Sequence, residues 1–397
     1  MKQITVVGAG FSGLTIARAL LKKGFQVTIR EKTSRAGGLI ETIQTPFGLA
    51  EKAAPSVTRT PRMDRLLEEL KVQTLEPSKA SKKRLFYVSG LTRWPLSVIE
   101  SLALGFNLLW SKLTGRLAPR PHETIRAWGE RCLTKAATHR LVATAFQGIY
   151  AGNANRMSAS LILGPLFSKS KRDPYVGVTG VEGGMSRFMQ ALEQDVKNRG
   201  GRFEFENPVS SELPENCVLA VPCSEASRIL AVKDPALSEL LSQVEEAPLV
   251  TATVFFEEPT GPNAFGCLVP RGAGPRVLGV LLNHAIFPGR DPKFSETWIY
   301  GGATDPDLVT LSKEEILKSI LLEREILFGK TNAPLHSEIT IWKKGLPHYD
   351  LVLEEVLQKI SEPKGLWLHG NWAGSIGLSR ILERSDALAE RIAKELN

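Results

Sequence analysis

Three glycines near the start of the chain have the spacing that holds a pyrophosphate. Gly8, Gly10 and Gly13 form the pattern GxGxxG, with Ser12 between the second and third glycine. In this pattern the first glycine permits a tight turn, the second lets the backbone approach a pyrophosphate, and the third lets a helix pack closely on a strand. The unpaired N–H groups and the dipole at the start of that helix favour an anion. The pattern therefore predicts a dinucleotide site.

The elements that must position these glycines are readable on both sides of them. Residues 2–7 form an apolar run typical of a strand, and a helical pattern follows the glycines as far as Lys23. A second strand, residues 26–30, ends at Glu31, eighteen residues after Gly13. A carboxylate at this position accepts hydrogen bonds from ribose hydroxyls, whereas a 2′-phosphate would require positive charge. Strand, turn, helix, strand and acid together predict a Rossmann-like unit.

The stretch after Glu31 distinguishes between cofactors. Arg35, Gly37, Gly38 and Thr42 extend the motif to E-x3-R-x-G-G-x3-T. This longer pattern resembles the FAD-binding amine oxidase superfamily. The resemblance implies that the arginine and the two glycines lie along the flavin side of the cofactor, so we expect FAD rather than a nicotinamide.

Composition indicates a globular protein of more than one domain. The chain has 397 residues, of which 43% are hydrophobic and 23% charged, and this length exceeds what one hydrophobic core usually supports. Its four cysteines have neither metal-ligand nor disulfide-framework spacing, so we expect a reducing compartment and no metal site. With the first nucleotide-binding strand starting at Lys2, we expect no signal peptide and a cytoplasmic location.

The net charge of +8 is concentrated in one region. Residues 59–140 contain 16 Lys and Arg but only 7 Asp and Glu. The same region contains the mostly apolar residues 94–113, with Trp94 and Trp110 near the ends. This composition fits a helix lying in a membrane interface, with basic flanks attracted to anionic headgroups at the inner face of the membrane. A buried amphipathic helix is the alternative, and no recognition motif supports nucleic-acid binding.

The rest of the chain alternates between nucleotide-domain and other patterns. We expect an α/β protein whose Rossmann-like FAD-binding domain is discontinuous and carries a helical insertion and a mixed-sheet substrate domain. In the third FAD-binding segment a strand at residues 365–369 leads through a loop to a helix at residues 378–396, whose start could stabilise negative charge on a reduced flavin. The predicted ranges are 1–83, 176–235 and 346–397 for FAD binding, 84–175 for the helical, membrane-facing insertion, and 236–345 for the substrate domain.

Nearly the whole chain resembles the protoporphyrinogen oxidase family. Single motifs are short, but their order along the chain matches that of the family. They are RLFYVSG at residues 84–90 with Trp94-Pro95, GIYAG at 148–152, FGCLVP at 265–270, LPHY at 346–349, and the final loop from Gly370 to Leu378. Two departures are Asn371, where the wider superfamily commonly has an aspartate, and the loop Glu51-Lys-Ala-Ala-Pro55 in place of an acidic-glycine-proline loop.

The resemblance implies a set of cofactor contacts. Val209 would hold the adenine through backbone hydrogen bonds, and the loop after Gly370 would close the flavin end. No cysteine lies near that loop, so the FAD should be non-covalent. The full implied set is Gly8, Gly10, Ser12, Gly13, Glu31, Arg35, Gly37, Gly38, Val209, Gly370, Asn371, Gly377 and Leu378.

The resemblance also implies an activity in haem biosynthesis. A porphyrinogen, either protoporphyrinogen IX or coproporphyrinogen III, would be dehydrogenated to the porphyrin in three two-electron steps, with hydride passing to flavin N5 and reoxidation by oxygen or another acceptor. Arg93 is the candidate partner for a substrate carboxylate. None of the six histidines can be assigned as a catalytic acid or base, and the oligomeric state is left open.

Two other functions remain open from the sequence. One is another flavin oxidase or desaturase of the same superfamily, acting on an amine or a carotenoid. Amine oxidases usually frame the substrate with paired aromatic residues, and Trp372 is the only obvious one in the last loop. The other is a non-catalytic scaffold with an FAD-binding fold, which would have no need of the flavin-side pattern at Arg35, Gly37 and Gly38.

Overall fold

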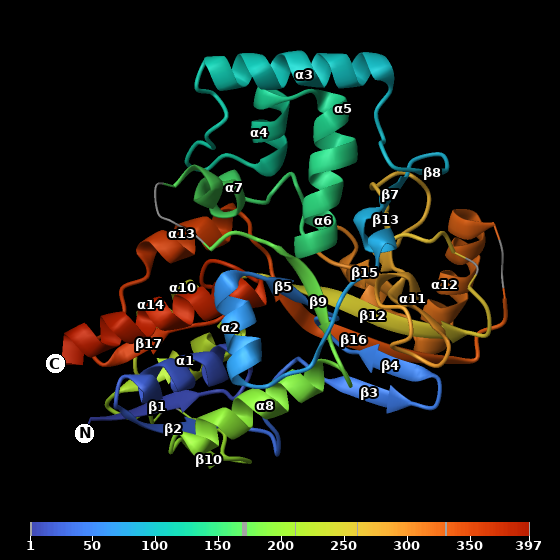
Figure 1. The fold of residues 1–397 in the computed structure, drawn as a ribbon. Coiled ribbons are helices and arrows are strands. Elements are labelled where there is room, and N and C mark those ends of the chain that lie inside the picture. Colours follow the sequence, from blue (N-terminus) through green and yellow to red (C-terminus); the bar gives the residue numbers. More distant parts are fainter. Residues whose placement is uncertain (1, 169–172, 211, 260, 330–331, 397) are drawn as a thin grey trace.

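The fold consists of two large sheets and a group of helices (Figure 1). The computed structural model describes residues 2–168, 173–210, 212–259, 261–329 and 332–396. The termini lie close together at the same end of the molecule, beside the smaller of the two large sheets (Figure 1).

The five-stranded sheet is entirely parallel. Its order is β10 (Arg202–Glu204), β2 (Gln26–Arg30), β1 (Gln3–Val7), β11 (Cys217–Leu219) and β17 (Leu366–Leu368). Parallel sheets are buried on both faces, which explains why β1, β11 and β17 are mostly apolar. The discontinuous Rossmann-like unit expected from the sequence is confirmed, because these strands come from the beginning, middle and end of the chain.

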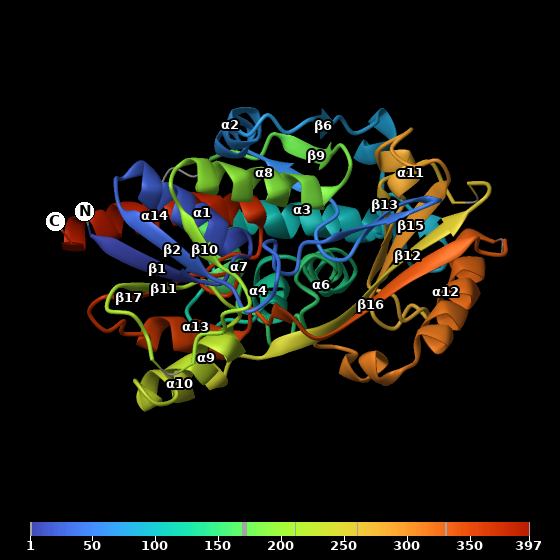
Figure 2. The ribbon, with the colours of Figure 1, turned by 90° about the horizontal axis from the view of Figure 1, so that it is seen from below.

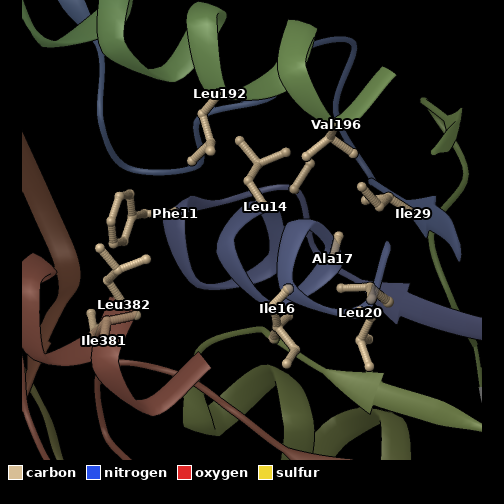
Figure 3. Close-up of a cluster of buried hydrophobic side chains, with 14 of the residues drawn as sticks. Phe11, Leu14, Ile16, Ala17, Leu20, Ile29, Leu192, Val196, Ile381 and Leu382 are labelled. Carbon is tan, nitrogen blue, oxygen red and sulfur yellow. The ribbon is translucent and has the colours of Figure 1, made fainter. Parts of the chain in front are cut away.

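One face of this sheet is covered by a layer of three helices. These are α1 (Phe11–Lys22), α8 (Met185–Asn198) and α14 (Leu378–Leu396). Leu14 of α1 points towards Leu192 and Val196 of α8, and Phe11 lies next to Leu382 of α14 (Figure 3). The opposite face packs on α9 (Cys223–Leu230), α10 (Pro235–Ser242) and α13 (Leu351–Lys359) (Figure 2). Strand β1, which leads into the first glycine turn, is therefore packed between helices on both faces of the sheet.

The larger sheet has seven strands and is mixed. Its order is β16 (His336–Pro347), β12 (Glu246–Phe256), β15 (Phe294–Gly301), β14 (Gly279–Leu281), β13 (Gly266–Leu268), β7 (Arg84–Tyr87) and β8 (Leu91–Thr92). Only β13 and β7 pair in parallel. Helix α12 (Lys313–Phe328) packs against this sheet and begins with a capping box formed by Ser312 and Glu315. The mixed sheet of the predicted fold class is confirmed.

The helices between the two sheets form a separate cluster, at the top of Figure 1. They are α3 (Val98–Leu113), α4 (Ile125–Cys132), α5 (Lys135–Ala137), a π-helical turn at Thr138–Ala143, α6 (Thr144–Tyr150) and α7 (Ala159–Phe167). The predicted insertion, residues 84–175, also contains β7 and β8, which join the larger sheet. No helix in the described ranges has the length and hydropathy to cross a bilayer.

Two small sheets complete the fold. The hairpin of β3 (Thr42–Thr45) and β4 (Gly48–Glu51) turns at residues 45–48. Strand β9 (Gly177–Val181) pairs with β5 (Val57–Arg59) and β6 (Thr74–Leu75). Helix α2 (Pro61–Glu69) and the short helix α11 (Asn283–Ile286) lie in the connections.

Candidate cofactor site

The predicted cofactor residues meet at one edge of the five-stranded sheet. Gly8 follows β1, Glu31 follows β2 and Gly370 lies two residues beyond β17. Carboxyl ends of parallel strands lie at the same edge of a sheet, where ligands of open α/β sheets bind. The parallel pairing of β2, β1, β11 and β17 therefore brings together residues from both ends of the chain.

The glycine turn has the geometry that its spacing predicts. Gly8 has φ +98° and donates its N–H to the carbonyl oxygen of Arg30 at 2.8 Å. A Cβ on Gly13 would lie 1.8 Å from the carbonyl oxygen of Gly8, so only glycine allows this contact between helix and strand. Helix α1 begins at Phe11. Its N-cap residue is Gly10, which has no side chain that could accept a hydrogen bond from the first N–H groups of the helix. The N–H groups of the first turn, which includes Ser12, are therefore left for an anion.

Gly10 leaves open space where another residue would place a side chain. The nearest atom to a Cβ built on Gly10 is the Cα of Gly38, at 3.8 Å. The protein itself would thus tolerate alanine here. Since the backbone φ of Gly10 is −71°, glycine is not needed for conformation either. The absent Cβ fits a pyrophosphate that approaches the backbone, so these residues fit a dinucleotide cofactor.

Glu31 is fixed by the backbone on both sides. It is 7% exposed, and its Oε2 accepts the N–H of Ala9 at 2.8 Å. Its Oε1 accepts both the N–H and the hydroxyl of Thr33, at 2.9 and 2.8 Å. A carboxylate has four lone-pair sites, so capacity remains for ribose hydroxyls. The turn and the acid form one preassembled unit.

Arg35 shapes the second glycine segment. Its Nη2 donates to the carbonyl oxygen of Gly38 at 3.0 Å and to Glu41 at 2.7 Å. Gly37 and Gly38 both have positive φ, +117° and +59°, and Gly37 forms a parallel bridge with Gly10. A Cβ on Gly38 would lie 3.0 Å from the Cα of Gly10, which explains why the pair must be glycine.

An ion pair that the sequence did not indicate extends this segment. Glu41 binds Lys52 at 2.9 Å as well as Arg35. Burial acts to raise the pKa of Glu41, but Lys52 and Arg35 together hold it below its usual value. Close by, Glu51 accepts the N–H of Met185 at the start of α8 and the hydroxyl of Thr42, and burial raises its pKa to about 7. No motif linked these residues, because their contacts depend on the hairpin.

Val209 lies near the ribose end of the site. It is 6% exposed, and two residues before it Asn207 donates its N–H to the carbonyl oxygen of Glu31 at 3.0 Å. The carbonyl oxygen of Val209 accepts a hydrogen bond from Arg228 at 3.1 Å, which leaves one lone pair for an adenine. The structure thus places Val209 two residues from a contact of Glu31, and its role toward an adenine stays a prediction.

The loop after β17 is anchored at several points. The indole Nε1 of Trp372 donates to the carbonyl oxygen of Val221 at 3.0 Å, and the hydroxyl of Tyr349 donates to the carbonyl oxygen of Asn371. Gly377 donates its N–H to Ser375 at 3.4 Å, and Leu378 is the first residue of α14. The loop and helix start match the sequence-based prediction, whereas the anchor Tyr349 was not foreseen.

Arg93 lies elsewhere in the fold. It is exposed and directly follows β8, the edge strand of the larger sheet, far from β1 and α1 in Figure 1. The structure does not bring Arg93 together with the residues of the glycine turn. Its role toward a substrate carboxylate stays a prediction.

The two histidines nearest the expected flavin end are both buried structural groups. His369 shares a hydrogen bond of 2.8 Å with Ser385, and burial lowers its pKa to about 3, so it is neutral. Nε2 of His348 accepts the N–H of Asn153 at 3.1 Å. Its neighbours Glu245 and Asp350 could form a metal cluster with it, but both carboxylates bind Arg156, at 2.6 and 2.9 Å. This cluster is an ion-pair network.

Comparison with known proteins gives one family. The flavin containing amine oxidoreductase model matches residues 11–211, just over half of the chain. Protoporphyrinogen oxidase of Bos taurus is 23% identical over 472 aligned residues, which cover 98% of each protein. A crystal structure from Exiguobacterium sp. 255-15, provisionally assigned as a protoporphyrinogen oxidase, superimposes with a TM-score of 0.80 at 19% identity and covers 99% of both chains. A putrescine oxidase variant gives 0.79 at 17% identity, with 98% of each chain covered.

Proposed function

The chain belongs to the flavin containing amine oxidoreductase family, and from that premise we propose that it oxidises a porphyrinogen to the porphyrin in haem biosynthesis. FAD is its cofactor and supplies the hydride acceptor. The observation that carries the proposal is the match to proteins named protoporphyrinogen oxidase, which covers 98% of this chain and 98% of the protein of Bos taurus, or 84% of the chloroplastic protein of Nicotiana tabacum. The ordered series of short motifs supports the same substrate class.

The chain's own residues divide the work of holding the cofactor. The start of α1 binds the pyrophosphate, Glu31 orients the ribose, and the start of α14 lies at the loop that closes the flavin end. Arg35 holds the second glycine of the pair through the carbonyl oxygen of Gly38. These groups position FAD and exclude alternative poses, while the redox chemistry belongs to the cofactor.

An apolar cluster offers the wall of the substrate site. Ala151 and Leu346 come from two of the family-like motifs and pack together with Leu278 and Trp342. The indole Nε1 of Trp342 donates to Thr251 at 3.2 Å, and the hydroxyl of Thr251 donates to the carbonyl oxygen of Lys52 at 2.7 Å. Lys52 pairs with Glu41, which binds Arg35. This chain of contacts links the predicted flavin-side segment to an apolar cluster, and a large, flat substrate requires apolar walls of this kind.

Anaerobic mixing with protoporphyrinogen IX and with coproporphyrinogen III tests the proposal. We expect one of them to bleach the flavin absorbance while porphyrin fluorescence appears, because hydride leaves the substrate for the cofactor. Free FAD with denatured protein is the control, and putrescine and a polyene are the competing substrates. Bleaching by the amine or polyene alone would identify a different flavin oxidase. If no compound bleached bound FAD, the scaffold function would replace ours. Readmitting oxygen then shows whether oxygen is the acceptor.

We also propose that the protein is cytoplasmic and contacts the inner face of a membrane through α3. Several apolar side chains of this helix point into solvent: Ile99 is 80% exposed, Leu102 70% and Phe106 69%. The basic residues Lys112 and Arg116 lie at its end. Only Ser111 of this helix is buried, so the amphipathic alternative of a buried helix is not what the structure has.

Sedimentation with phosphatidylserine vesicles checks the membrane contact. The double variant Ile99→Asp with Phe106→Asp should lose at least about tenfold in vesicle affinity, because two apolar side chains no longer enter the interface. Val232→Asp is the matched control, since Val232 is 75% exposed at the end of α9, on another part of the surface. Equal binding of the double variant and the wild type would refute the role of α3.

A further inference from the structure

A cavity of about 310 Å³ lies between α13 and α14, beside the end of β17. This volume is at the lower end of the range for small-molecule sites and is far larger than one water requires. Most of its wall is apolar, including Leu357 and Ile360 of α13 and Leu388 of α14. Trp372 and Ala373 of the loop after β17 close one side, and His369, Arg384, Arg391 and Glu362 supply the polar groups.

Arg384 is the unusual member of this wall. Its Nη1 is fully buried without a hydrogen-bond partner, and the guanidinium makes no hydrogen bond or ion pair with any residue in the described ranges. Burial lowers its pKa from the usual value, but an arginine stays charged at neutral pH. A buried cation without a partner is costly. The cavity wall therefore contains a partly buried guanidinium without a direct hydrogen-bond partner in the described ranges, and Glu362 of the same wall acts on it electrostatically from a distance.

The neighbouring polar groups do not neutralise Arg384. Glu362 is the only acid of the wall, and its two oxygens accept hydrogen bonds from the N–H of Leu368, at 2.7 Å, and from Arg391, at 2.5 Å. His369 is neutral and bonded to Ser385. The positive charge of Arg391 is thus paired directly, whereas Glu362 attracts Arg384 only from a distance, without a hydrogen bond.

We propose that this cavity binds a small monocarboxylate through Arg384. The planar guanidinium matches a carboxylate, and an aliphatic body of a few carbons would replace water against Leu357, Ile360 and Leu388. The site is separate from the glycine turn, but its wall includes Trp372, next to the predicted cofactor contact Asn371. The inference does not depend on porphyrinogen oxidation.

A titration of the full-length protein with its FAD bound tests the site. The probes are acetate, butyrate and hexanoate, with hexanol and hexylamine as uncharged and cationic probes of equal length. Calorimetry should show that hexanoate binds saturably and more tightly than acetate, because its chain contacts the apolar wall. Arg384→Met should weaken hexanoate binding at least about tenfold. Arg391→Met, which removes a paired arginine of the same wall, should keep most of the affinity.

The following results of these experiments would overturn the proposal. Hexanol or hexylamine binding as tightly as hexanoate would show that the charge of Arg384 is not used, and this comparison needs no variant. Unchanged binding by Arg384→Met, or no saturable binding by any carboxylate, would do the same. The thermal midpoint without ligand is a further check. It should not fall in Arg384→Met, because the variant removes an unpaired buried charge, and a marked fall would show that Arg384 has a structural partner.

Discussion

Gly10→Ala is expected to give a folded protein that has lost about 10–100-fold in FAD affinity. The added methyl group would meet no protein atom closer than 3.8 Å, and the backbone at Gly10 is already in a conformation open to alanine. A bound pyrophosphate must approach the same point, so the cost appears only when the cofactor binds. Crowding by one methyl group costs about 1–3 kcal/mol, which corresponds to the stated loss. The flavin content after dialysis and an FAD titration of the apoprotein measure it.

Two other glycine variants control this experiment. Gly105→Ala lies on α3, where a Cβ meets nothing within 4 Å, and should bind FAD normally. Gly13→Ala would place a Cβ 1.8 Å from the carbonyl oxygen of Gly8, so it should lower the stability of the whole unit as well as FAD binding. A Gly10→Ala protein that keeps its yellow colour and wild-type FAD affinity would show that the pyrophosphate lies elsewhere.

The cofactor end of the molecule was largely predictable because its signals are local. The spacing of Gly8, Gly10 and Gly13 depends on one turn between adjacent elements, and the helix from Leu378 begins directly after the loop that the sequence showed. Such contacts follow from neighbouring residues, so periodicity and turn chemistry suffice to find them. The family resemblance then connected the two ends of the chain.

Contacts between distant segments could not be predicted in the same way. Strand β7 pairs in parallel with β13, with Arg84 opposite Gly266, so part of the range predicted as a helical insertion belongs to the larger sheet. The residues of a short apolar strand do not indicate which other strand it pairs with. Likewise, the link from Glu41 to Lys52 and the hydrogen bond from Tyr349 to Asn371 exist only once separate segments have packed. Charged and aromatic residues in loops have many possible partners in a sequence.

A buried ion pair of the larger sheet is the most consequential contact of this kind. Arg324 of α12 and Glu296 of β15 are 0% and 1% exposed. Nε and Nη2 of Arg324 donate to the two carboxylate oxygens of Glu296 at 3.0–3.2 Å, and its guanidinium carbon lies 3.8 Å from the ring centre of Phe256. The pair therefore fixes α12 on the sheet, which also contains the strands of the proposed substrate wall.

Breaking this pair is expected to destabilise the protein strongly. Either Glu296→Gln or Arg324→Met should lower the free energy of unfolding by about 3–5 kcal/mol, because each removes the charged partner of an ionised group in the core. The double variant should recover most of that loss. Its glutamine can still accept the hydrogen bond that the indole Nε1 of Trp298 donates to Glu296 at 3.2 Å, and no buried charge remains. Urea denaturation of the FAD-saturated protein, followed by circular dichroism, measures all three.

The double variant shows whether the ion pair stabilises the fold because the two buried charges balance each other or because Arg324 and Glu296 make specific packing contacts. If it were as unstable as the worse single variant, the loss would come from packing, for instance of Arg324 on Phe256. Recovery to within about 1–2 kcal/mol of the wild type would assign the loss to unpaired charge. Glu355→Gln is the control, because Glu355 and its partner Lys359 are both exposed and should contribute less than about 1 kcal/mol. Since α12 and the proposed substrate wall share this sheet, a pair that acts through packing would also change porphyrinogen turnover, whereas charge balance alone would leave turnover intact in the double variant.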